Sequence, residues 1–87
     1  MLIVSQNKKK IINLNTIQYI NIFQNQLWAG NIPNNQLGDF DTVLGTYETE
    51  ERAKEVLQEI IGEYKQWNKD ANNAVTIIPK VYEMPKE

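Results

Sequence analysis

Residues 44–61 read LGTYETEERAKEVLQEII, and this stretch decides the fold because a strand pattern changes into a helix pattern within it. Apolar side chains then recur every three or four residues as far as Trp67, which is the spacing of one helix face. Thr49 stands where its hydroxyl can accept from backbone amides one turn into the helix, and Glu50 and Glu51 place negative charge at the positive end of the helix dipole. The stretch predicts one amphipathic helix that ends near residue 67 or 68.

The segments around the helix carry short strand patterns separated by polar turns. Strands are expected at residues 2–4, 11–14, 17–23, 27–32 and 42–47, with a last one at 74–78. The first two should form a hairpin, and Asn25 should take the left-handed conformation in the turn before the fourth. The expected fold is therefore α+β, with a small antiparallel sheet of about five to six strands and one long amphipathic helix packed on one face.

The bulk composition excludes several classes of protein. The 87 residues are expected to form a single domain, 1–87, with a modest core. The absence of cysteine excludes a disulfide framework and fits a reducing interior such as the cytoplasm. A net charge of -2 makes nucleic acid an improbable partner, and the short apolar runs indicate neither a signal peptide nor a membrane span.

The strands carry apolar side chains on both faces. In residues 17–23, Ile17 and Tyr19 alternate with Ile20 and Ile22, so neither side is plainly polar. A single helix covers only one face, and a second covering surface is needed. We favour another copy of the chain, in a homodimer or higher homo-oligomer, because a C-terminal tail containing prolines is a poor cover. The alternative is a strongly coiled half-barrel that closes its own core.

Catalytic chemistry has little to build on in this chain. There is no histidine, and Ser5 is the only serine. Neither a nucleophile elbow nor a glycine-rich phosphate loop nor a dinucleotide fingerprint occurs. We therefore expect no catalytic residue, no metal and no cofactor.

A few residues suggest a small anionic ligand. Arg52, the only arginine, stands at the expected first helical turn, shortly after Tyr47. Arg52 with Lys9 and Lys10 would supply positive charge, and Tyr47 with Trp28 would stack on a base. The alternatives are a surface ion pair for Arg52 and a charged turn for the lysines.

Glycines within the expected strands allow two interpretations. Gly30 and Gly45 mark either a close approach of a neighbouring aromatic ring or room for a ligand. Packing is the favoured interpretation of both.

Four acidic residues recur at intervals of four along the expected helix. They are Glu51, Glu55, Glu59 and Glu63. A solvated acidic face is the favoured interpretation, and a contact with a basic partner is the functional alternative. A cation site is less favoured, because oxygen-only sites draw their ligands from a loop that wraps the ion.

Three segments resemble a family of small proteins from low-GC Gram-positive bacteria and their phages. They are MLIVSQ at 1–6 with IINL at 11–14, LGTY at 44–47 with TEERAKEVL at 49–57, and YEMP at 82–85. The resemblance implies a sheet-plus-helix fold and a phage or prophage setting. In style the chain is also similar to proteins that counter Thoeris-type defence, which are small oligomers with ligand pockets between subunits.

The function expected from this resemblance is counter-defence without catalysis, in the cytoplasm of an infected or lysogenic bacterial host. The protein would bind and sequester a small anionic ligand such as a defence signalling nucleotide. The alternative is an inhibitor or adaptor that acts on a host protein such as a CRISPR effector, through the acidic residues or the loop at 33–40. A virion assembly protein is a third possibility.

Overall fold

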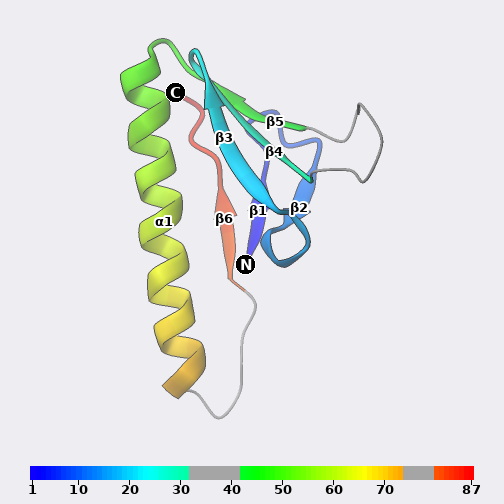
Figure 1. Cartoon of the computed structure of the whole chain (residues 1–87), viewed down its shortest axis with the longest axis vertical. Helices are drawn as coiled ribbons and strands as arrows, with labels where there is room; N and C mark the ends of the chain where they lie inside the picture. The colour runs from blue at the N-terminus through cyan, green and yellow to red at the C-terminus, as the bar shows by residue number, and fades with distance from the viewer. Residues whose placement is uncertain (32–41, 74–79) are drawn as a thin grey trace.

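The computed structural model describes residues 1–31, 42–73 and 80–87, which form one helix and two small sheets (Figure 1). The elements in chain order are β1 (Leu2–Val4), β2 (Ile11–Asn13), the short 3-10 helix η1 (Leu14–Thr16), β3 (Tyr19–Phe23), β4 (Gln26–Gly30), β5 (Thr42–Thr46), α1 (Glu50–Asn73) and β6 (Val81–Glu83). The α+β class is confirmed. The single sheet is wrong, because the strands divide into two sheets of three strands, ordered β2-β1-β6 and β3-β4-β5.

The first sheet brings the two ends of the chain together. β1 and β2 form the expected antiparallel hairpin, in which Ile3 pairs with Ile12. β6 then pairs with β1 in parallel, so a purely antiparallel arrangement is also wrong. The strand expected at 74–78 lies outside the described residues, and β6 follows a few positions later at Val81–Glu83.

The turn of the hairpin is held by Ser5. Its buried hydroxyl donates to the side chain of Asn7 at 2.8 Å and accepts from the amide of Lys10 at 3.2 Å. Lys8 takes a left-handed φ of 65° in this turn. The only serine of the chain therefore satisfies the backbone of a tight turn, which accounts for its burial.

The second sheet is an antiparallel meander of β3, β4 and β5. Gln24, with a φ of 57°, takes the left-handed position in the turn before β4, whereas we expected Asn25 there. The Asn25 side chain instead donates to the carbonyl of Tyr47 at 2.5 Å, a bond that ties this turn to the end of β5. The Asn25 carbonyl also accepts from the amide of Tyr47 at 2.9 Å, so both the side chain and the backbone of Asn25 bind the end of β5.

Gly45 on β5 is required by packing, as expected. A Cβ at this position would lie 2.9 Å from the Tyr47 hydroxyl oxygen and 3.0 Å from a ring carbon. The first distance is shorter than real Cβ contacts and the second is tighter than nearly all of them, so the Tyr47 ring occupies the space that a side chain would need.

The helix begins as expected and ends later than expected. The Thr49 hydroxyl accepts from the amide of Arg52 at 3.1 Å, which confirms the N-cap. The helix runs to Asn73 instead of ending near Trp67 or Asn68. Residues 68–73 contain neither glycine nor proline, and each of their polar side chains disfavours a helix by only some tenths of a kcal/mol.

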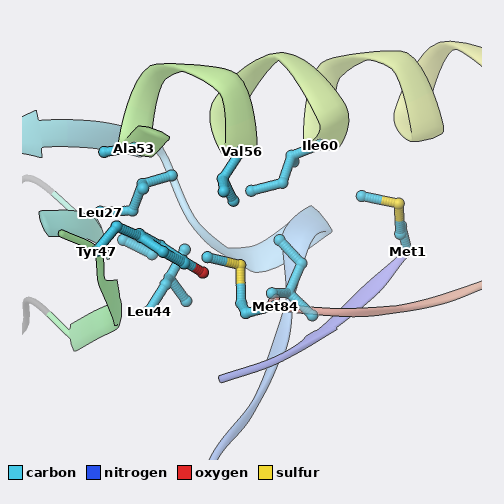
Figure 2. Close-up of a cluster of buried hydrophobic side chains, with 10 residues drawn as sticks. Met1, Leu27, Leu44, Tyr47, Ala53, Val56, Ile60 and Met84 are labelled. Atoms are coloured by element: carbon cyan, nitrogen blue, oxygen red, sulfur yellow. The ribbon is translucent and has the colours of Figure 1, made fainter. Parts of the chain in front are cut away.

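The helix and both sheets bury apolar side chains in one common core. Ala53, Val56 and Ile60 of α1 point toward Leu27 and Leu44 of the second sheet (Figure 2). The first sheet and its flanks contribute the remaining buried side chains, which include Met1, Ile3 and Met84. The C-terminal segment was expected to be a poor cover, but Met84 is only 2% exposed and belongs to this core.

Candidate functional site

Tyr47 and Arg52 lie together at the start of α1. The Arg52 guanidinium is 6.0 Å from the centre of the Tyr47 ring. They line a hollow of about 420 Å³ together with Thr46, Glu48, Thr49, Lys86 and Glu87. The structure thus brings together two of the residues expected to bind an anionic ligand.

The C-terminal segment already contacts the polar groups of both residues. The Arg52 Nε and Nη2 atoms donate to the backbone oxygen of Glu87 at 3.1 and 2.9 Å. The Tyr47 hydroxyl donates to the carbonyl of Pro85 at 2.9 Å, and burial raises the pKa of Tyr47 to about 12. An anion at Arg52 would therefore compete with Glu87 for the guanidinium fork.

The acidic residues on α1 face the C-terminal strand. Arg52 Nη1 lies 3.5 Å from a carboxylate oxygen of Glu55 and 3.8 Å from one of Glu59. Glu63 forms an ion pair with Lys80, just before β6. Three of the four residues expected to form an acidic surface thus have partners within the chain, while Glu51 is exposed.

The remaining residues expected at the ligand site lie elsewhere. Leu27 and Ala29 of β4 are buried in the core, so strand alternation directs Trp28 to the opposite face of the sheet, away from Tyr47. The Trp28 indole Nε1 is buried and has no hydrogen-bond partner in the described part of the chain. Lys9 and Lys10 are exposed in the hairpin turn, where Lys8 pairs with Glu83 at 3.2 Å.

A larger hollow runs along the other side of α1. This α1–β3 groove has a volume of about 560 Å³ and lies between the helix on one side and η1 and β3 on the other. Its lining is mainly apolar and consists of Leu14, Ile17, Gln18, Tyr19, Ile20, Leu57, Ile60, Ile61, Tyr64 and Lys65. Ile61 and Tyr64 are 37% and 38% exposed, so the groove presents apolar side chains to solvent.

The sequence contains a signal for this groove, which is the width of the apolar face of α1. From Val56 to Ile61 the apolar residues cover about 140° of the helix circumference, at about 100° per residue. Val56 and Ile60 are buried in the core, while Ile61 stands at the outer edge of the apolar face. The apolar face of α1 is thus wider than the part that the core buries, and the remainder, at Ile61, forms an exposed apolar strip beside the core.

Few polar side chains line the groove. Of the described residues in its lining, Lys65 is the only charged one, and the other polar side-chain groups are the tyrosine hydroxyls and the Gln18 amide. Across residues 1–31, 42–73 and 80–87, no three histidine, cysteine or acidic side chains gather as a metal would require. No helix in these ranges is long and apolar enough to cross a membrane.

Comparison with protein families, curated proteins and solved structures finds no match to this chain.

Proposed function

We propose that this protein acts by binding another protein and not by catalysis, and that the α1–β3 groove receives apolar side chains of the partner. The observation that carries the proposal is the exposure of Ile61 and Tyr64 within a groove of about 560 Å³. Exposed apolar surface bordered by polar residues is typical of protein-interaction sites. Of the two leading functions expected from the sequence, this geometry favours the protein inhibitor or adaptor.

The partner that we propose is a host protein, in keeping with the phage or prophage setting expected from the sequence. The acidic residues on α1 are less suited to hold it. Glu55 and Glu59 contact Arg52, and Glu63 contacts Lys80, so a basic partner would have to displace these cations. A partner that binds in the groove would displace no ion pair of the described residues.

A photo-cross-linking amino acid at Ile61 tests the proposal. Benzoylphenylalanine at position 61 should capture one specific host protein in infected cells, and the same group at Phe23 should not. Phe23 is a matched control, since it is a 61% exposed apolar residue on β3 that lies outside both the groove lining and the first sheet. Ile61→Asp should then abolish binding of the purified partner. Capture of the same proteins from both positions, or binding that survives Ile61→Asp, would overturn the proposal.

A second candidate function is sequestration of a small anionic ligand at Arg52. The hollow of about 420 Å³ that contains Tyr47 and Arg52 supports it. A ligand there would replace the Glu87 oxygen at Arg52 and keep the Tyr47 ring alongside. Cyclic nucleotides and ADP-ribose derivatives should then raise the melting temperature of the wild type but not of Arg52→Ala. No shift with any of these compounds would end this candidate.

Self-association is also part of the proposal. Ile11 is 67% and Val81 54% exposed, and both flank β1 in the first sheet. Their partners in register are Val4 and Leu2, so the four side chains share the face opposite the buried Ile3. We define this set as the outer β1 face and propose that a second copy packs on it.

A further inference from the structure

The two sides of α1 differ in whether their charged side chains have partners among the described residues. Glu55, Glu59 and Glu63 follow one another at intervals of four and lie on the side toward β6. Arg52 and Lys80 meet these carboxylates, and the Tyr82 hydroxyl donates to Glu59. The carboxylates on this side therefore interact with other groups of the chain, and two of these interactions hold the helix against the C-terminal strand.

The side that borders the α1–β3 groove carries lysines that have no ion-pair partner among the described residues. Lys65 lines the groove, is exposed, and forms no side-chain hydrogen bond or ion pair with any residue that the structure describes. Lys54 and Ile61 precede it by eleven and four residues, a spacing that places all three along one line on the helix surface. Lys54 is likewise exposed and without such a partner among the described residues. The exposed Ile61 is thus bracketed by two lysines.

Among the residues that the structure describes, the lining of the groove contains no carboxylate to offset these lysines. Glu50 lies one turn before Lys54, at the far N-terminal end of the helix. A partner that fills the groove with apolar side chains would bring its flanking residues next to Lys65, and carboxylates are the groups that lysine favours there.

The length of the helix wall of the groove matches a short partner helix. From Leu57 to Lys65 the helix wall extends over about 12 Å, which equals about two turns of a partner helix. An amphipathic helix places apolar residues on one face at intervals of three or four, which is how such helices enter apolar grooves. We infer that the partner segment bound in the α1–β3 groove is an amphipathic helix with acidic residues flanking its apolar face. The inference rests on the docking function proposed above.

Two synthetic peptides provide the test. Both carry four leucines on one helical face, one has glutamate at every flanking position, and the other has lysine instead. Fluorescence anisotropy with the full-length protein should give an affinity about tenfold higher for the acidic peptide. Because the protein has a net charge of -2, overall charge opposes this preference, and only local lysines can produce it.

Charge reversal at Lys65 should remove the preference. Lys65→Glu should weaken the acidic peptide by about tenfold and strengthen the basic one. Lys9→Glu is the matched control, because it makes the same change of charge at an exposed hairpin position, and it should alter either affinity by less than about twofold. Circular dichroism and melting temperatures verify that both variants fold.

The outcomes separate the inference from the function on which it rests. Equal affinities for the two peptides, with binding lost in Ile61→Asp, would refute the acidic partner and leave the groove as a docking site. Failure of both peptides to bind would also refute the inference, since the structure offers the groove to any helix of this kind. Binding that Ile61→Asp leaves unchanged would refute both.

Discussion

The hydroxyl of Tyr82 on β6 donates to a carboxylate oxygen of Glu59 on α1 at 3.0 Å, and this bond joins the last strand to the helix. Burial raises the pKa of Tyr82 well above its usual value, and the hydrogen bond to Glu59 raises it further. Glu59 also lies 3.8 Å from Arg52 on the same helix, and Arg52 in turn donates to the backbone oxygen of Glu87. Glu59 thus contacts β6 directly and the end of the chain through Arg52. Glu59 therefore has a structural role.

Removal of the Tyr82 hydroxyl should lower stability modestly. Tyr82→Phe keeps the ring but loses the bond to Glu59, and we expect a loss of about 0.5–1 kcal/mol in the free energy of unfolding measured with urea. Tyr64→Phe is the control, because no hydrogen bond of the Tyr64 hydroxyl occurs among the described residues. Equal effects of the two substitutions would contradict the role given to Tyr82.

Gly45 and Gly62 should respond in opposite directions to alanine. Gly45→Ala places a Cβ 2.9 Å from the Tyr47 hydroxyl oxygen and should destabilise by about 1–3 kcal/mol. Gly62 lies within α1, where a Cβ would meet nothing within 4 Å, so Gly62→Ala should stabilise by up to about 1 kcal/mol. Urea unfolding of both variants measures the difference. A neutral Gly45→Ala would show that the Tyr47 ring is free to move away.

Alkaline pH should weaken the attachment of the C-terminal segment. The folded protein raises the pKa of Tyr47 from 10.0 to about 12, so it favours the neutral phenol. The stability that this provides is complete below pH 10 and declines as the pH rises from 10 toward 12. Tyr47→Phe lacks the titrating group and should show a smaller decline of the urea midpoint over this range. Parallel declines in the two proteins would contradict the assignment.

Disruption of the outer β1 face should convert an oligomer into a monomer. We expect wild-type protein to sediment as a dimer or larger at micromolar concentration, and Ile11→Glu to sediment as a monomer. Phe23→Glu tests the specificity of this surface, since Phe23 is 61% exposed but lies on the second sheet. A monomeric wild type would remove self-association from the account.

Local patterns in the sequence predicted the first five strands and the start of the helix, because each of these depends on nearby residues. The N-cap at Thr49, the hairpin of β1 and β2 and the packing of Gly45 all follow from short-range geometry. The division into two sheets depends on the pairing of β1 with β6, whose residues stand almost eighty positions apart. Hydrophobic periodicity predicts individual strands but does not predict which distant strands pair.

The candidate site was harder to predict for the same reason. Tyr47 and Arg52 are close in sequence, and the structure does bring them together. Their contacts with Glu87 and Pro85 join distant segments, and no local pattern in the sequence indicates them. The α1–β3 groove likewise depends on how far β3 extends beside the helix, although the exposed position of Ile61 was implicit in the width of the apolar helix face.

The most direct test of the docking groove is a nuclear magnetic resonance titration of the isotope-labelled protein with the acidic amphipathic peptide. The account predicts that the largest amide shifts cluster at the groove, including those of Leu14, Ile20 and Ile61. Shifts that cluster instead around Tyr47 and Arg52, or on the outer β1 face, would contradict it.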